Sequence, residues 1–366
     1  MRICIATGIF PPDKGGPAQF SSAYAKWLTE NNNEVVVLSL TDLSSEITTK
    51  GSLKIILHSR KASLITRFIK TANSIRKISK DHVILANGLF LEIFFASLFA
   101  RISYIAKVPG DIVWERARNR NETKLNIDQY QGQEQSSKKL MRWCFTQSLK
   151  RSRYVIAPSA HMKNLITAWG IKPEKIVVIP NSVDIDLFAP NLSANKSFDL
   201  ITICRLTPWK GVSELIEESA KKDLSIAIVG SGSEEQSLRV LADKLKAKAT
   251  FLGEQIQSEL PSLINQSKVF VLNSNYEGSP HALLEAMACG AISVARGTTG
   301  TNEVIKDGIN GFLFGSSRTL GAALDLALNE VGRKSDISTR ARALVVDNND
   351  RDQHFIKITN LLREVS

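Results

Sequence analysis

The sequence is poor in the residues that mark specialised protein classes. Its 366 residues include four cysteines, and no two of them have the CxxC spacing of a zinc ribbon or a redox pair: Cys4, Cys144, Cys204 and Cys289. Glycine and proline are sparse (21 and 11 residues) and only 23% of residues are charged, which excludes collagen-like, low-complexity and coiled-coil chains. We therefore expect a globular, cytoplasmic protein whose thiols stay reduced.

A long apolar run is also missing. The most apolar stretch, residues 83–106, is interrupted at four positions, by Asn87, Gly88, Glu92 and Arg101. It therefore falls short of the roughly 20 apolar residues that a membrane span requires. The apolar segment at residues 3–6 is too short for the core of an export signal and is typical of a first strand. We expect a chain that begins at residue 1 and does not cross a membrane.

Short apolar runs alternate with helix-compatible segments along the chain, in which 43% of residues are apolar. The runs lie at 2–6, 34–39, 53–57, 83–86, 104–107, 154–157 and 176–179, and then at 200–204, 225–229, 250–252, 269–273 and 292–295. Several are apolar at nearly every position, as in strands buried on both faces of a parallel sheet. A polar linker at 191–197 separates the two sets. This pattern predicts an α/β fold of two doubly wound, Rossmann-like domains, over 1–190 and 191–348, with a final helix in 349–366 and a ligand in the cleft between the domains.

The excess positive charge lies in the first half. Residues 1–195 hold 27 Lys and Arg against 15 Asp and Glu, whereas residues 196–366 hold 20 against 21. Two segments, 60–80 and 138–153, combine basic and apolar residues at helical spacing. They fit either ordinary surface helices or an anionic membrane surface, where each Lys or Arg contributes about 1 kcal/mol of attraction. No zinc finger, RNP-type strand or helix-turn-helix accompanies the charge, so we expect no nucleic acid partner.

Each predicted domain carries a glycine-bearing turn after an early strand. Gly15 and Gly16 precede a helix expected from about Ala18, and Gly230 and Gly232 follow an apolar strand. Glycines at a helix start allow close backbone approach to an anionic ligand. The same pattern also fits an ordinary strand-to-helix turn.

The segment 275–290 is the most informative part of the chain. Ser279 and Pro280 predict a helix start and Gly290 its end, which places Glu277 just before the helix and Glu285 within it. A helix N-terminus binds phosphate and carboxylates accept hydrogen bonds from sugar hydroxyls, so these residue types suit a nucleotide-sugar. His281 lies in the same segment and is either a contact to the sugar or a surface residue.

Two cations follow a predicted strand elsewhere in the second half. Arg205 and Lys210 come directly after the run at 200–204. Arginine grips a phosphate with two parallel hydrogen bonds and lysine adds a point charge, so the pair suits a diphosphate.

These motifs together resemble the retaining nucleotide-sugar transferases of glycosyltransferase family 4, which have the two-domain GT-B fold. The resemblance rests on 15–17, 180–184, 205–211, 229–232, 277–290, 300–303 and 307–311. It implies that Glu277 contacts the donor hexose, Glu285 the ribose, and Arg205 and Lys210 the diphosphate, with Glu303 also at the donor. It also implies transfer without a metal or other cofactor, an acceptor held by the first domain, and a final helix that crosses back to that domain.

The chain departs from this family at one position. Many members carry a histidine that faces the donor sugar after the fifth strand, whereas residues 107–115 hold none. Asp111 is our candidate for that place as a catalytic residue, and its alternative role is to cap the next helix. Asp184 and Asp186 spell the DxD string of metal-dependent enzymes, but they fall in the family's interdomain segment and are not expected to bind metal.

The sequence therefore predicts a metal-independent hexosyltransferase that moves a sugar from a UDP- or GDP-linked donor to a saccharide acceptor in cell-surface glycan synthesis. The basic first half favours a lipid-linked acceptor and a peripheral place on the inner face of the cell membrane. Two alternatives stay open. A sugar-nucleotide epimerase of the same fold would need no acceptor, and an inactive scaffold would bind the nucleotide-sugar without turnover.

Overall fold

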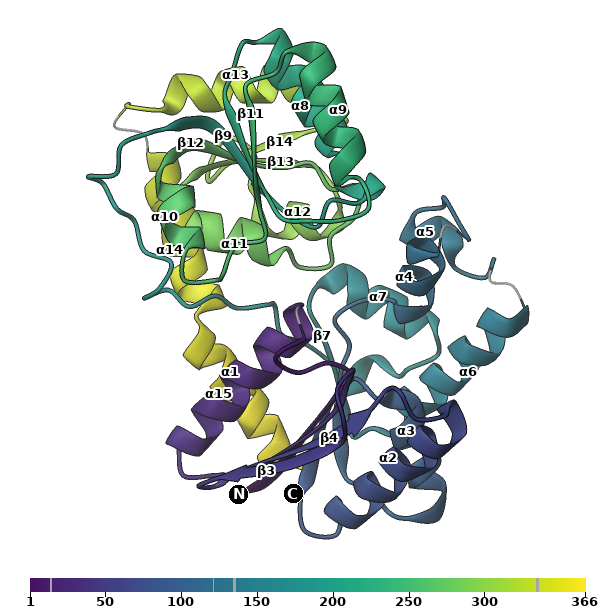
Figure 1. Ribbon diagram of the computed structural model, residues 1–366. Coiled ribbons are helices and arrows are strands. Elements are labelled where there is room, and N and C mark those ends of the chain that lie inside the picture. Colours follow the sequence, from purple (N-terminus) through teal and green to yellow (C-terminus); the bar gives the residue numbers. More distant parts are fainter. Residues whose placement is uncertain (14, 121, 134–135, 334–335) are drawn as a thin grey trace. The chain divides into compact units, whose positions relative to one another are not determined.

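The chain folds into two compact units, shown in Figure 1 as a computed structural model that describes residues 1–13, 15–120, 122–133, 136–333 and 336–366. Unit 1 comprises Met1–Ile179 and Phe355–Ser366, and unit 2 comprises Pro180–His354. The sequence predicts this first boundary later, after residue 190. The chain enters unit 2 sooner because Val183 and Phe188 are buried in the core of that unit.

Unit 1 is built on an eight-stranded sheet in the order β3-β4-β2-β1-β5-β6-β7-β8. The strands are β1 (Arg2–Thr7), β2 (Glu34–Thr41), β3 (Glu46–Lys50), β4 (Leu53–Ser59), β5 (Val83–Asn87), β6 (Tyr104–Lys107), β7 (Tyr154–Ala157) and β8 (Ile176–Val178). All neighbours are parallel except β3 and β4. The parallel strands are the predicted ones. β3 was not predicted, because all five of its residues are exposed and give no apolar signal.

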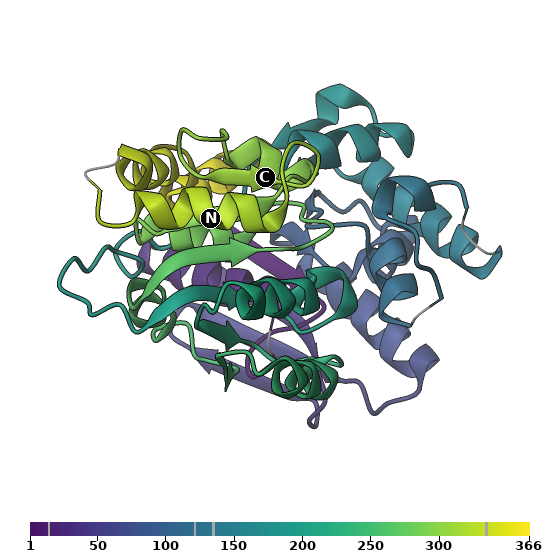
Figure 2. The same ribbon diagram turned by 90° about the horizontal axis from the view of Figure 1, so that it is seen from above.

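Helices cover both faces of the unit 1 sheet. They are α1 (Gly16–Glu30), α2 (Leu64–Ile78), α3 (Phe90–Phe99), α4 (Ile112–Asn119), α5 (Ile127–Tyr130), α6 (Ser136–Arg151), α7 (Ala160–Ala168) and α15 (Arg351–Arg363). One face is covered by α1 and α15, whose Tyr24 and Thr359 hydroxyls share a hydrogen bond of 2.8 Å. Both termini therefore end in unit 1, and they lie near each other in Figures 1 and 2.

Unit 2 has a six-stranded parallel sheet in the order β11-β10-β9-β12-β13-β14. Its strands are β9 (Phe198–Ile203), β10 (Ile226–Val229), β11 (Ala249–Gly253), β12 (Ser267–Leu272), β13 (Ile292–Arg296) and β14 (Phe312–Phe314). The three-residue β14 was too short to be predicted. Two separate apolar clusters show that both faces of this sheet are buried, as the nearly continuous apolar runs indicate.

The helices of unit 2 divide between these two clusters. One cluster contains residues of α8 (Val212–Lys221), α9 (Glu235–Leu245) and α13 (Leu320–Glu330), and the other contains residues of α10 (Leu260–Asn265) and α11 (His281–Ala288), while α14 (Asp336–Asn349) contributes to both. The short α12 (Thr299–Val304) follows β13. Both units are therefore doubly wound α/β folds, in which ligands bind at the carboxyl ends of the strands.

Candidate functional site

A lysine and a glutamate meet beyond the carboxyl ends of two neighbouring strands of unit 2. Lys210 ends the 3-10 helix η2 (Pro208–Lys210), which follows β9, and Glu277 lies in the loop after β12. Lys210 Nζ donates to Glu277 Oε1 at 2.5 Å, and the two side chains are only 18% and 14% exposed. Each charge needs the other, because a largely buried charge without a partner is costly. The structure thus joins two residues that the sequence analysis assigns to one donor site.

Three further side chains tie together the loops that carry this pair. Asn273, which directly follows β12, donates from Nδ2 to the carbonyl oxygen of Gly211 at 2.7 Å and accepts from Arg296 Nε at 2.9 Å. Arg296 also forms an ion pair with Glu214 of α8. This network fixes the loops after β9 and β12 relative to each other. It was not predicted, because a single asparagine after an apolar strand is a weak signal in a sequence.

Two glycines allow backbone segments to approach closely beside the pair. A Cβ atom on Gly211 would lie 2.6 Å from the carbonyl oxygen of Asn273, and one on Gly300 would lie 2.2 Å from the carbonyl oxygen of Glu277. Real Cβ contacts are longer than this, so only glycine fits at either position. Gly300 lies in α12, and the exposed Glu303 lies on the same helix.

Gly230 and Gly232 pack against the loop that carries Arg205. Their Cβ atoms would lie 1.9 Å from the carbonyl oxygen of Cys204 and 2.1 Å from that of Leu206. These glycines are therefore required for the contact between two loops, and their predicted contact with a donor stays a prediction. Arg205 lies between Cys204 and Leu206 in the sequence, and its side chain is exposed.

The start of α11 differs from the prediction. The helix begins at His281, which is exposed. Pro280 is its N-cap residue and has an extended backbone conformation, so it lies before the first turn and not within it. Ser279 does not cap the helix, because its hydroxyl oxygen accepts from the backbone N–H of Asn181 at 3.2 Å. The predicted end is confirmed, since Gly290 follows the C-cap with a φ of +71°.

Glu285 is a partly buried carboxyl group in α11. Burial raises its pKa to about 7, although a hydrogen bond with Gln257 partly opposes this shift. A carboxyl group with such a pKa exists in both protonation states near neutrality and can either accept or donate a hydrogen bond. This property suits a contact with a hydroxyl group, which also donates and accepts.

Asp111 makes structural contacts in unit 1, and its assignment as a catalytic residue stays a prediction. Its buried Oδ1 accepts from the backbone N–H groups of Val113 and Trp114 at 3.0 and 3.2 Å, and so caps α4. Its Oδ2 accepts from Gln131 at 3.0 Å and from Arg142 at 2.6 Å. With both oxygens used and no exposed surface, the carboxylate matches the alternative role as a cap.

The other unit 1 candidates, Gly15 and Gly16, lie at the start of α1. Gly15 is the N-cap with a φ of +136°, and the helix begins at Gly16, two positions before the expected start. No side chain caps this helix. Pro17 has no backbone N–H group, and those of Ala18 and Gln19 donate to the carbonyl oxygen of Gly15 at 3.0 and 3.1 Å. The predicted contact of this turn with a donor stays a prediction.

The DxD string has a structural explanation. Asp184 Oδ2 pairs with Arg351 at 2.5 Å, and its Oδ1 accepts from the backbone N–H of Leu187 at 3.1 Å. Within the described ranges, no three His, Cys, Asp or Glu side chains are grouped so as to hold a metal ion.

Comparison with known proteins identifies the family. The family described as "Glycosyl transferases group 1" matches residues 184–344, and "Glycosyltransferase Family 4" matches residues 114–187. The chain therefore belongs to the family 4 type of glycosyltransferases with the GT-B fold.

Solved structures and curated proteins give particular relatives. HepE of Anabaena in complex with UDP-glucose superimposes with a TM-score of 0.78 at 19% identity over 100% of both chains. Sucrose-phosphate synthase from Thermosynechococcus elongatus gives a TM-score of 0.81 at 16% identity, covering 99% of this chain and 98% of that one. The UDP-Gal:α-D-GlcNAc-diphosphoundecaprenol α-1,3-galactosyltransferase of Escherichia coli is 31% identical over 39% of this chain and 42% of its own length. The matches to the curated relatives span less than two thirds of those proteins.

Proposed function

We propose that the protein is a retaining glycosyltransferase that moves a hexose from a UDP- or GDP-sugar to a saccharide acceptor carried by a membrane lipid. The observation that carries this proposal is the Lys210–Glu277 ion pair in unit 2, in which Lys210 follows the same strand as the exposed Arg205. Support comes from the family and from HepE, a protein of the same fold that forms complexes with UDP and UDP-glucose.

The proposed chemistry uses the fixed positive charge of unit 2. Transfer breaks the bond between the anomeric carbon and the diphosphate, and negative charge develops on the departing oxygen. Lys210 and Arg205 would stabilise this charge, which lowers the barrier most when the cations are already in place. They would take the part that a metal ion plays in other transferases, so the reaction needs no metal or other cofactor.

Two carboxyl groups complete the proposed donor site. Glu277 orients Lys210 through their 2.5 Å hydrogen bond and keeps its second oxygen for a hexose hydroxyl. Glu285 would bind the ribose, where its raised pKa allows it to match either role of a hydroxyl group. His281 and Glu303 are exposed on neighbouring helices and would contact the same ligand from its edge.

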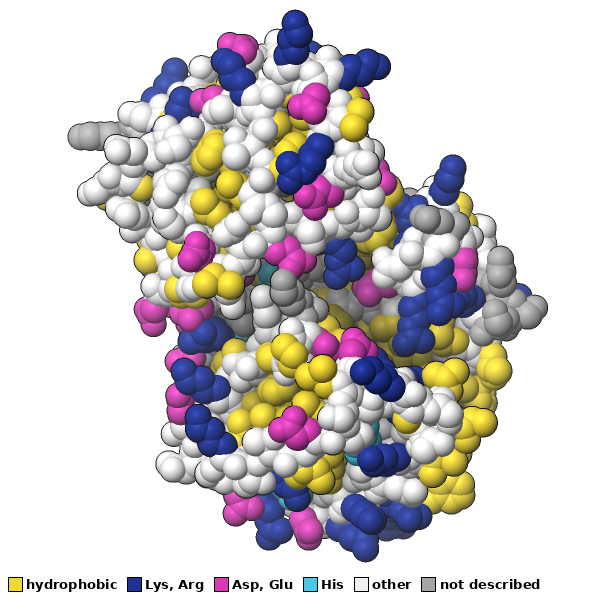
Figure 3. All heavy atoms as spheres, in the orientation of Figure 1, with side chains coloured by type: hydrophobic (Ala, Val, Ile, Leu, Met, Phe, Trp, Pro, Cys, Tyr) yellow, Lys and Arg dark blue, Asp and Glu magenta, His cyan; other side chains and the backbone are white. Residues whose placement is uncertain are grey.

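A surface of unit 1 supports the membrane part of the proposal. An apolar patch of exposed side chains lies on α2, α3 and α6: Leu64, Ile65, Ile69, Phe95, Leu98, Phe99, Leu140 and Trp143. In Figure 3, hydrophobic side chains gather along this part of unit 1 with Lys and Arg side chains nearby. Exposed apolar groups with basic neighbours attract an anionic bilayer surface. Among the described residues, no helix combines the length and apolar character needed to cross a membrane.

Names of relatives support the lipid-linked acceptor. The E. coli relative acts on a diphosphoundecaprenol-linked sugar, and a Campylobacter jejuni relative, 28% identical over 54% of this chain and 56% of that protein, is named for a diphospho-undecaprenol substrate as well. We propose an acceptor of the same chemical class, which would require the enzyme to work at a membrane surface.

The proposal is tested by product analysis in the presence of EDTA. The protein is incubated with UDP- and GDP-sugars and a prenyl-diphosphate-linked sugar, and the anomeric configuration of the product is read by NMR. We expect an α-linked product from an α-linked donor, with no loss of rate in EDTA. An inverted product or an absolute need for a metal would contradict the mechanism. Conversion of the donor into a different sugar-nucleotide when no acceptor is added would identify an epimerase instead.

A further inference from the structure

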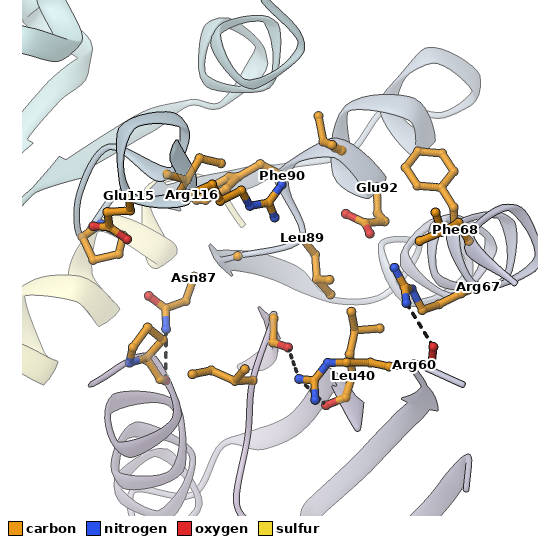
Figure 4. A pocket seen from close by; sticks show the side chains of 18 of the residues that line it. Leu40, Arg60, Arg67, Phe68, Asn87, Leu89, Phe90, Glu92, Glu115 and Arg116 are labelled. Atoms are coloured by element: carbon orange, nitrogen blue, oxygen red, sulfur yellow. Dashed lines mark hydrogen bonds between the residues drawn. The ribbon is translucent and has the colours of Figure 1, made fainter. Parts of the chain in front are cut away.

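Unit 1 contains a pocket of about 870 Å³ that the proposed donor chemistry does not use. It lies at the carboxyl ends of parallel strands, where Gly8, Leu40 and Asn87 line it. The first turns of α2 and α3 and the side chains of α4 form the remaining walls (Figure 4). Such a place at the end of an α/β sheet is where ligands bind in this fold class.

The three arginines that line this pocket differ in how their charges are balanced. Arg60 is neutralised by Asp13 at 2.6 Å and Asp42 at 3.1 Å. Arg67 donates only to the carbonyl oxygen of Arg60, at 3.3 Å, and its Nε is buried without a hydrogen-bond partner. The Arg116 side chain donates to the sulfur of Met141, at 3.2 Å. Within the described part of the chain, Arg67 and Arg116 are thus cations without an ion pair at a common cavity.

Two carboxylates also line the pocket, in different situations. Figure 4 shows Glu92 between Arg116 and Arg67, and burial raises its pKa even though both arginines lower it in part. Glu115 lies against the backbone of Gly110, where an added Cβ would meet its Oε1 at 2.3 Å. The interior therefore disfavours the charge of Glu92, while both nearby cations are left with hydrogen-bond donors to spare.

Backbone groups add to this positive character. The N-terminal turn of α3, from Leu89 to Glu92, lines the cavity. The N-cap residue Leu89 makes no side-chain hydrogen bond to this turn, and the Glu92 carboxyl group bonds only to its own backbone N–H. Uncapped N–H groups at the start of a helix attract an anion, and arginine matches the oxygens of a phosphate. The charged end of the pocket therefore suits a phosphoryl group.

The opposite wall of the pocket is apolar and continues onto the surface. Leu64 and Ile65 line the cavity yet are 72% and 74% exposed, so they form its rim. Phe68 lies deeper and packs edge-to-face on Phe95 of α3, with ring centroids 4.9 Å apart. Beyond the rim, the apolar patch runs on over α2 and α3. An apolar chain could leave the pocket along this surface without meeting a charged wall.

We propose that this pocket binds the phosphorylated head of an apolar-chain acceptor, with Arg67 and Arg116 on the phosphoryl oxygens and the chain leaving over Leu64 and Ile65. This inference rests on the proposed function and deepens it, because it assigns to named residues the part of the acceptor that the sugar donor does not touch.

The test measures binding of farnesyl diphosphate, farnesol and inorganic diphosphate to the full-length protein by calorimetry. Arg67→Gln is compared with Arg76→Gln, an exposed arginine on the same helix that does not line the pocket. We expect Arg67→Gln to weaken farnesyl diphosphate binding about tenfold or more, since it removes charge-assisted hydrogen bonds, and Arg76→Gln to change it less than twofold. Ile65→Ser should weaken farnesyl diphosphate but not inorganic diphosphate.

Each other outcome overturns a defined statement. Equal affinity for inorganic diphosphate and farnesyl diphosphate would show that the pocket binds only the anion. Equal affinity for farnesol and farnesyl diphosphate would show that the arginines do not contribute to binding. No binding of farnesyl diphosphate, while a UDP- or GDP-sugar still raises the melting temperature, would overturn this inference and leave the proposed function standing. Failure of the nucleotide-sugars to bind would overturn the proposed function itself.

Discussion

The two units hold their charged side chains in opposite ways. In unit 2, Lys210 is paired with Glu277, and a second network of Asn273, Arg296 and Glu214 fixes the loops around that pair. In unit 1, Arg67 and Arg116 line a cavity without an ion pair among the described residues, and the surface beside them is apolar. The difference teaches that the charges of the unit 2 pair balance each other within the chain, whereas the charges of Arg67 and Arg116 are balanced by no ion pair among the described residues.

The largest effect is expected from breaking the unit 2 pair. Lys210→Ala should lower the rate of transfer about 10³-fold, because it removes a fixed cation from the departing diphosphate. It should also cost stability, since Glu277 would stay largely buried without a partner. Urea unfolding of Lys210→Ala, Glu277→Ala and the double variant checks this, and we expect the double variant to be no less stable than either single one.

A matched control for this change is Lys248→Ala, which removes an exposed lysine paired with Asp223 elsewhere in unit 2. It should leave transfer unchanged and cost less than about 1 kcal/mol. If Lys210→Ala behaved like this control, the ion pair would have no role in the reaction.

The next effect concerns Asp111 and would separate a structural role from a catalytic one. Asp111→Ala removes the cap of α4 and leaves Arg142 without this partner, so we expect a loss of about 3 kcal/mol in the free energy of unfolding. The exposed Asp128→Ala should cost less than about 1 kcal/mol. A variant at Asp111 that kept its stability but lost transfer would support the catalytic assignment and contradict a purely structural role.

A smaller effect is expected in the pH dependence of stability. The pKa of Glu285 is raised to about 7 in the folded chain, so the folded state binds a proton more tightly than the unfolded state does. The stabilisation is therefore present at low pH and is lost as the pH rises from the ordinary range toward 7. Between pH 5 and pH 8, the wild type should lose about 2–3 kcal/mol more than Glu285→Gln. Parallel profiles for the two proteins would show that Glu285 is not responsible.

The smallest effect on stability, with a distinct effect on binding, is expected on the apolar patch of unit 1. Phe99→Ser changes a side chain that is 76% exposed, so unfolding should shift by less than about 0.5 kcal/mol. Binding to anionic vesicles should fall several-fold, whereas Ile256→Ser, an equivalent change on unit 2, should leave it unaltered. Vesicle flotation measures the binding of both variants. An equal fall in vesicle binding for Phe99→Ser and Ile256→Ser would contradict a membrane-facing unit 1.

The sequence predicts the parallel strands well because each is apolar enough to be buried on both faces. Glu277, Lys210 and Arg205 could be assigned because glycines and strand ends surround them in an order that a known family shares. The unpredicted features depend on contacts between distant segments. Ser279 bonds to Asn181 instead of capping α11, and this cannot be read from the local pattern.

Unit 1 was harder to predict for a related reason. The basic segment at 60–80 has the spacing of a helix with a buried apolar side, but Leu64 and Ile65 are exposed while Ile75 is buried. The periodicity of the apolar residues predicts the helix, but it does not predict which of those residues are buried against the core. The pocket is equally invisible in the sequence, because Arg67 and Arg116 come from different helices, α2 and α4.

The most direct test of the central claim is the melting temperature with UDP, GDP, ADP and the corresponding sugars in EDTA, for the wild type and Lys210→Ala. A ligand that binds only the folded state raises the melting temperature, and at a fixed concentration the rise grows with the logarithm of its affinity. The account predicts a selective rise with one nucleotide and its sugar, and its near loss in Lys210→Ala. No rise with any of them, or an equal rise in both proteins, would contradict a nucleotide-sugar site built on this lysine.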